Sequence, residues 1–133
     1  MLDDRNTTAS SRRVTDPQLW NRETNLIAWD YYLGDARGTD RVSQYAAPAR
    51  AVDLAGLPSA SIFAGQADLF VDENVDYAQR LMNANVLTNL YVYAGAPHGF
   101  FRLNTKASTT KRFYLDRDYV LGRVLGTKLQ STV

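Results

Sequence analysis

The spacing of apolar residues along the chain predicts three helices. In each of three segments, apolar side chains recur every three or four positions, as they do on one face of a helix. The segments cover residues 24–33, 72–85 and 109–125. Their apolar positions are Leu26, Ile27, Trp29, Tyr31 and Leu33 in the first, Val75, Ala78, Leu81 and Met82 in the second, and Phe113, Val120, Leu121 and Val124 in the third. A residue that tolerates the left-handed backbone conformation is expected to end each helix. These residues are Gly34, Asn85 and Gly126.

Two short segments have the composition of strands. Residues 59–65 are mostly apolar without strict alternation, which is typical of a strand covered on both faces in a parallel sheet. Residues 88–93 are rich in aromatic and β-branched side chains. Because a helix is predicted between them, we expect the two strands to run parallel, joined by a crossover connection. The order strand, helix, strand, helix predicts an α/β fold.

The N-terminal segment has no such pattern. Residues 1–17 are rich in Asp, Asn, Thr, Ser and Arg, and we expect a surface segment or a loop that leads into the first helix. Asp16 and Pro17 could open a helical turn, because proline tolerates the first helical position. Asp3 and Asp4 are adjacent acids of a kind that metals favour. We expect them to be solvated, as adjacent acids in a polar loop usually are, and no set of ligands for a metal can be assembled around them.

Composition excludes several classes of site. The chain has 133 residues, the length of one domain, and 45% apolar and 22% charged residues are ordinary for a globular protein. It has no cysteine and one histidine, His98. These counts exclude a disulfide framework, a thiolate zinc site, a cysteine nucleophile and any site built from several imidazoles.

Charge and hydropathy bear on partners and location. Fifteen basic and fourteen acidic residues give a formal net charge of +1, so electrostatics gives no reason to expect nucleic acid or an anionic membrane as partner. No apolar run approaches the roughly 20 residues that span a bilayer. The polar N-terminal residues resemble neither a secretory signal nor a transit peptide, and we expect a cytoplasmic location.

Two titratable residues follow the predicted strands directly. Asp68 lies just past the first strand and His98 just past the second. Sites in open α/β sheets form at the carboxyl ends of the strands, and neighbouring strands are about 4.8 Å apart. If the strands pair directly, the carboxylate could accept a hydrogen bond from the imidazole, fix its tautomer and stabilise the imidazolium formed during proton transfer.

Simpler interpretations of these residues stay open. A single histidine in a turn rich in proline and glycine is often only a surface or packed residue. An aspartate after a strand often only caps the following helix, as Asp68 could. Asp72 is a rival for the acid, although its position favours a capping role at the predicted helix.

Several segments, taken in order, resemble the C-terminal part of α/β-hydrolases, and most of all the hormone-sensitive-lipase-like (fold-3) esterases. The segments are MLDDR at 1–5, WDYYLG at 29–34, VSQYAAPAR at 42–50, DLAGLP at 53–58, AGQADLFVDE at 64–73, YAQRL at 77–81 and VYAGAPHGF at 92–100. The resemblance runs from the first residue to about Gly126. It implies that Asp68 corresponds to the acid and His98 to the base of the family's catalytic triad. It also implies short acyl esters as substrates, and neither a metal nor an organic cofactor.

One part of the family's pattern is missing from the 133 residues. The family's chemistry needs a serine in G-x-S-x-G and a glycine-rich oxyanion loop, and neither sequence occurs here. The resemblance therefore implies that residues 1–133 are the C-terminal part of an α/β-hydrolase domain, without the part that carries the nucleophile. Since a base needs a positioned hydroxyl and an oxyanion needs donors, we expect little or no esterase activity from this chain alone.

Two kinds of function follow. In the first, the chain supplies the Asp and His of a serine carboxylic-ester hydrolase whose serine lies outside it. In the second, it is a truncated, non-enzymatic remnant that acts as an interaction or structural module. In the complete fold, the strand at residues 61–64 would have a second strand neighbour. We expect this edge to pair with another copy, to be completed by a separate polypeptide, or to leave the chain partly ordered.

Overall fold

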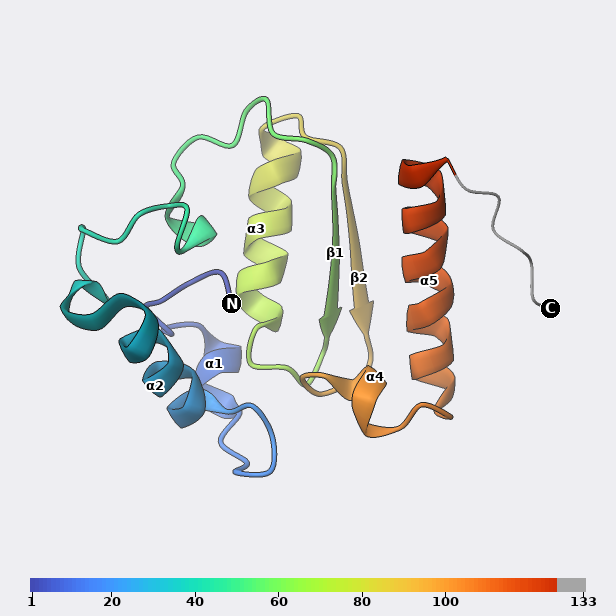
Figure 1. Cartoon of the computed structure of the whole chain (residues 1–133), viewed down its shortest axis with the longest axis horizontal. Helices are drawn as coiled ribbons and strands as arrows, with labels where there is room; N and C mark the ends of the chain where they lie inside the picture. The colour runs from blue at the N-terminus through green and yellow to red at the C-terminus, as the bar shows by residue number, and fades with distance from the viewer. Residues whose placement is uncertain (127–133) are drawn as a thin grey trace. The chain divides into compact units, whose positions relative to one another are not determined.

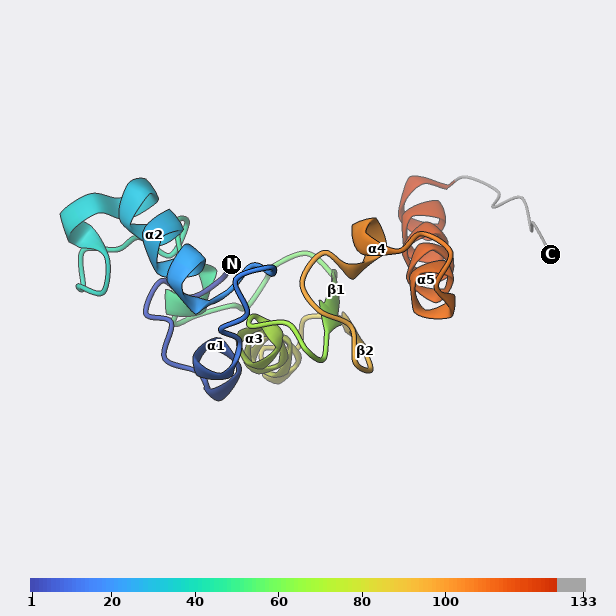
Figure 2. The same cartoon turned by 90° about the horizontal axis from the view of Figure 1, so that it is seen from below.

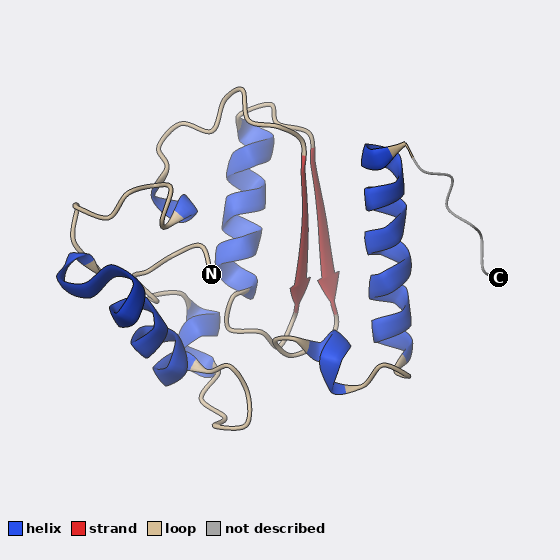
Figure 3. Cartoon of the chain, viewed as in Figure 1, coloured by secondary structure: helices blue, strands red, loops and turns tan. Residues whose placement is uncertain are grey.

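The computed structural model describes residues 1–126 and forms two compact units, one of residues 1–98 and one that begins at residue 99 (Figure 1). The first unit contains both strands, the helix that joins them and the N-terminal helices. The second contains the last two helices. Both predicted strands and all three predicted helices are present, and Figure 3 distinguishes the helices from the strands by colour.

The first unit is built on a two-stranded parallel sheet. Strand β1 (Ala60–Gly65) pairs with β2 (Thr88–Tyr93) in a register that runs from Ala60 opposite Thr88 to Gly65 opposite Tyr93. Helix α3 (Val71–Asn83) connects the strands and packs against both of them. Since the strands are direct neighbours, the turns that follow them leave the sheet at the same end.

Two apolar clusters form the core of this unit. The first lies between α3 and the sheet, where buried Ala51, Leu54, Leu81 and Val86 contact Ile62 of β1. The second lies in the N-terminal part, where Trp29, Val42 and Ala47 pack together with Leu33. A short 3-10 turn, Pro48–Arg50, lies between these two clusters along the chain.

Helix α2 (Arg22–Leu33) begins where Asn21 accepts a hydrogen bond from the Thr24 N–H and ends at Gly34, which has a positive φ of 52°. The expected widening of its apolar face was wrong, because Ile27 and Tyr31 are exposed. Trp29 is the apolar side chain that the helix buries. Apolar spacing alone does not show how wide a face a helix buries.

Helix α3 also differs from its predicted face. Ala78 and Leu81 are buried, but Val75 and Met82 are more than two-fifths exposed. Its first turn includes Glu73, a carboxylate that is only 5% exposed. Polar residues of the N-terminal segment therefore cover part of this helix.

The N-terminal segment is more ordered than its composition suggested. Residues 9–13 form a helix, α1 (Ala9–Arg13), and Figure 2 shows it beside α3. Thr8 caps α1 by accepting a hydrogen bond from the Ser11 N–H. At Asp16 and Pro17 the chain forms a single turn, in which the Leu19 N–H donates to the Asp16 carbonyl at 3.1 Å, and no helix follows until Arg22.

The expectation that Asp3 and Asp4 are solvated was also wrong, because both are buried and paired with arginines. Asp3 receives hydrogen bonds from Arg5. Asp4 is fully buried and pairs with Arg50 through two hydrogen bonds of 2.6 and 2.9 Å. Burial acts to raise the pKa of Asp4, but the hydrogen bonds from Arg50 and the Gly38 N–H outweigh it and hold that pKa below its ordinary value.

The second unit contains α4 (Phe100–Leu103) and α5 (Ser108–Leu125). Phe100 and Phe101 both contact the ring of Phe113 from α5. As predicted, α5 ends at Gly126, which has the left-handed conformation. Leu121 and Val124, predicted to share the apolar side of α5, are exposed.

Candidate active site

The turn after β1 places Asp68 at the carboxyl end of the sheet. The strand ends at Gly65, and the Asp68 N–H donates to the Gly65 carbonyl to form a tight turn. The Asp68 side chain is buried, and its Oδ1 accepts a hydrogen bond from the Phe70 N–H at 3.1 Å. One carboxylate oxygen therefore fixes the turn, and the other is left for a second partner.

The turn after β2 is joined to the first turn by three hydrogen bonds. The Gln66 N–H donates to the Tyr93 carbonyl and the Ala67 N–H to the Ala96 carbonyl, both at 2.9 Å. The side-chain oxygen of Gln66 accepts from the Gly95 N–H at 3.1 Å. His98 follows directly along the chain, so these bonds set the distance between the histidine and the first turn.

Gly65 makes this junction possible because it has no side chain. A Cβ at this position would lie 2.2 Å from the Ala96 carbonyl oxygen, closer than atoms can approach. The two turns can therefore meet only because glycine ends β1.

The junction brings Asp68 and His98 together. His98 Nδ1 lies 2.9 Å from Asp68 Oδ2. An ionised carboxylate can only accept, so in this contact Nδ1–H donates to Asp68 and the lone pair of the neutral ring is on Nε2. Within residues 1–126, Nε2 has no hydrogen-bond partner, and the His98 side chain is 42% exposed. Such a pair can take a proton at Nε2 and stabilise the resulting imidazolium through Asp68.

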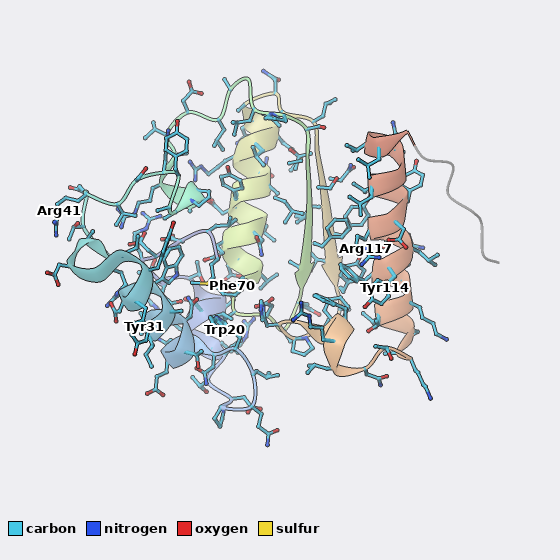
Figure 4. The ribbon with its side chains drawn as sticks, in the orientation of Figure 1. Trp20, Tyr31, Arg41, Phe70, Tyr114 and Arg117 are labelled. Atoms are coloured by element: carbon cyan, nitrogen blue, oxygen red, sulfur yellow. The ribbon has the colours of Figure 1, made fainter. Side chains whose placement is uncertain are left out.

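Two aromatic rings lie against His98. Phe70, from the turn after β1, meets the imidazole edge to face with ring centroids 5.2 Å apart. Trp20, from the loop between α1 and α2, lies with its centroid 6.1 Å from that of the imidazole. Figure 4 labels both residues. No local pattern in the sequence connects Trp20 with a histidine so far along the chain.

Asp72, the rival acid, has a different partner. Its Oδ2 accepts a hydrogen bond from the Ser10 N–H at 2.7 Å, within the first turn of α1. Asp72 therefore caps α1, whereas the sequence favoured a cap on its own helix. Among the described residues, the acid hydrogen-bonded to His98 is Asp68.

Glu73 is a buried acid that sequence analysis did not single out as a site residue. It accepts a hydrogen bond from the Leu2 N–H at 2.7 Å. Burial raises its pKa to about 7 from the ordinary value of 4.5, and the hydrogen bond from Leu2 offsets only part of this shift. Glu73 connects the N-terminal residues to α3.

Residues 1–126 contain no group of three or more His, Cys, Asp or Glu side chains arranged to hold a metal ion. In the same part of the chain, no helix combines the length and the apolar character needed to cross a bilayer.

Comparison with protein families identifies the fold. A model of the α/β-hydrolase fold family matches residues 1–102, which include both strands, Asp68 and His98. The chain belongs to the α/β-hydrolase family. This confirms the resemblance found in the sequence and the predicted partial α/β-hydrolase fold, with its two parallel strands.

Several solved esterases are similar to this chain in structure. A bacterial heroin esterase is 36% identical with a TM-score of 0.82, and the match covers 87% of this chain and 37% of that chain. Esterase LipW from Mycobacterium marinum is 35% identical with a TM-score of 0.84, and the match covers 94% of this chain and 38% of LipW. A thermostable esterase from Pseudomonas putida ECU1011 is 29% identical with a TM-score of 0.76, and the match covers 85% of this chain and 36% of that esterase. Comparison with curated proteins gives no match. The chain spans less than two-fifths of the length of these esterases.

Proposed function

We propose that this chain supplies the acid and the base of a serine esterase. In this proposal Asp68 is the acid, His98 is the base, and the serine nucleophile comes from outside the 133 residues. The substrates are small acyl esters. The observation that supports the proposal best is the 2.9 Å hydrogen bond between His98 Nδ1 and Asp68 Oδ2 at the carboxyl end of parallel strands.

The proposed reaction assigns one proton to one atom in each step. Nε2 of His98 takes the proton of the serine hydroxyl while the serine oxygen bonds to the ester carbonyl carbon. Asp68 accepts the hydrogen bond from Nδ1–H and stabilises the imidazolium. The imidazolium then gives the Nε2 proton to the departing alkoxide, which leaves as an alcohol. Water, with its proton taken by Nε2 of His98, then attacks the carbonyl carbon of the acyl-enzyme. The bond to the serine oxygen breaks, the imidazolium returns the proton to that oxygen, and the carboxylic acid is released.

The sequence explains why we expect little turnover from this chain alone. None of its seven serines lies in a G-x-S-x-G motif. A base without a positioned hydroxyl and without oxyanion donors lacks most of what accelerates acyl transfer. The activity is therefore expected only when a polypeptide with these parts completes the fold.

The experiment is a complementation assay with p-nitrophenyl acetate. The chain is assayed alone and mixed with a polypeptide made of the part of M. marinum LipW that the chain does not cover. We expect hydrolysis from the mixture only, lost in His98→Gln and strongly reduced in Asp68→Asn. Asp72→Asn is the matched control, since its carboxylate caps α1 and should leave the rate unchanged.

Two outcomes would overturn the enzymatic proposal. One is a mixture that assembles but stays inactive. The other is activity that survives His98→Gln. The genomic sequence next to the first codon offers a separate check, because an in-frame G-x-S-x-G there would locate the serine.

The non-enzymatic alternative rests on the edge of β1. Among the described residues, β1 has β2 as its only strand neighbour. An edge of this kind is a template for pairing with another strand, from a second copy or another polypeptide. Light scattering of the purified chain tests this. A dimer would favour self-pairing, and a monomer that melts cooperatively at low micromolar concentration would count against it.

A further inference from the structure

His98 is held from more than one side. Asp68 fixes one edge of the imidazole through Nδ1, and Phe70 from the same turn contacts the ring. Trp20 reaches the imidazole from a different part of the chain, with its ring plane tilted by 43°. A histidine that is 42% exposed needs such contacts if its ring is to keep one orientation.

Trp20 is itself fixed by a chain of buried amides. Its indole N–H donates to Asn25 Oδ1 at 3.3 Å. Asn25 is fully buried, and its side-chain amide donates to Asn6 Oδ1 at 3.2 Å. The Asn6 side chain donates to the Arg22 carbonyl, and the Arg22 guanidinium donates to the Asn6 carbonyl at 2.6 Å. Buried amides must find partners, so this set has few alternative arrangements.

The surroundings of Trp20 differ from those of the other tryptophan. Trp29 is 2% exposed and lies among apolar side chains, as expected of a core residue. Trp20 is only partly buried, and it contacts a buried amide and the imidazole. A purely structural role would explain the first tryptophan but not the amide chain that orients the second.

We propose that Trp20 is a positioning residue for His98. It limits rotation of the imidazole so that Nδ1 stays on Asp68 and Nε2 faces outward. This role rests on the proposed function, because an oriented Nε2 matters only if His98 transfers a proton.

The test is NMR of the full chain, in which the single histidine gives one set of imidazole signals. The variants are Trp20→Leu, which removes the ring, and Trp20→Phe, which keeps an aromatic face. Trp29→Phe is the matched control, and urea unfolding checks each fold. We expect Trp20→Leu to shift the His98 proton signals and to speed exchange of the Nδ1 proton with water, because the imidazole is then less restricted. Trp20→Phe should restore part of both, and Trp29→Phe should change neither.

Asp68→Asn separates failure of this inference from failure of the proposed function. If Asp68→Asn alters the His98 signals and Trp20→Leu does not, the positioning role is wrong and the acid–base pair stands. If neither variant alters them, the pairing itself is wrong. Should the Trp20 variants unfold, nuclear Overhauser contacts between the Trp20 and His98 rings in the unaltered chain decide the question. Their absence would overturn the positioning role.

Discussion

The end of the sheet and the N-terminal segment are ordered by different kinds of interaction. The turns after β1 and β2 are joined mainly through the backbone, as in the bond from Ala67 N–H to the Ala96 carbonyl. The N-terminal residues are held by buried side chains with partners far along the chain, such as Asp4 with Arg50. The backbone junction depends on chain geometry and on the absence of a side chain at Gly65. Buried ion pairs depend on the identity of both partners.

Removing one partner of the buried ion pair tests the second kind of order. Arg50→Met leaves the fully buried Asp4 carboxylate without its cation. We expect the free energy of unfolding to fall by about 3–5 kcal/mol, because an uncompensated buried charge is costly. Urea unfolding measures the loss. Hydrogen exchange should show that the N-terminal amides lose protection before those of β1 and β2.

The matched control neutralises both partners. Asp4→Asn combined with Arg50→Met leaves no unpaired charge, so the double variant should be more stable than Arg50→Met alone. If the single and double variants lose the same stability, the pair does not order the N-terminal segment.

Glu73 should make stability depend on pH, because it connects the N-terminal residues to α3. Its pKa is about 7 in the folded chain and near 4.5 when unfolded, so between these values the folded state binds more protons. Its contribution is thus greatest below pH 4.5 and falls as pH rises to about 7. The difference corresponds to about 3 kcal/mol.

Comparison with Glu73→Gln isolates this group from the other acids. The amide does not titrate, and its oxygen can still accept from the Leu2 N–H. Urea unfolding at several pH values between 4.5 and 7.5 gives the difference in stability between the two chains. Parallel curves would show that Glu73 does not titrate in this range.

The same contrast explains what the sequence could predict. The segment from β1 to β2 was predicted within a few residues, because apolar patterns report local structure and a crossover makes strands parallel. The contact of Asp68 with His98 followed from that topology, since turns after neighbouring strands leave the sheet at one end. Their catalytic roles remain a prediction from family resemblance and chemistry.

The remaining features depend on partners that no local pattern reveals. Asp4 is buried with Arg50 and the Gly38 N–H as its partners, and a polar segment gives no sign of either. Trp20 reaches His98 through folding of a loop, without periodicity to predict it. The sole signal in the sequence was a large aromatic side chain within a polar stretch. Ile27 shows the opposite case: its apolar character predicted burial, but the side chain is exposed.

Gly65 tests the backbone junction at the end of the sheet. In Gly65→Ala the new Cβ would lie 2.2 Å from the Ala96 oxygen, so the turns must separate. We expect a loss of about 1–3 kcal/mol, typical of overpacking, together with altered His98 signals in NMR spectra. Gly56→Ala is the control, because its φ of 75° strains alanine but nothing lies within 4 Å. An unchanged His98 signal in Gly65→Ala would show that the junction does not set the position of His98.

Asp72 offers the smallest effect and the sharpest separation of the two regions. It lies four residues after Asp68, yet its carboxylate accepts from the Ser10 N–H and belongs to the N-terminal framework. Asp72→Ala should lower the free energy of unfolding by about 1 kcal/mol, as expected for loss of a helix cap, and leave the His98 signals unchanged. Asp68→Ala should change the His98 signals, because it removes the acceptor of the Nδ1 proton. If Asp72→Ala also shifts the His98 signals, the two regions are coupled through the first turn of α3, and the side-chain and backbone networks form one structure.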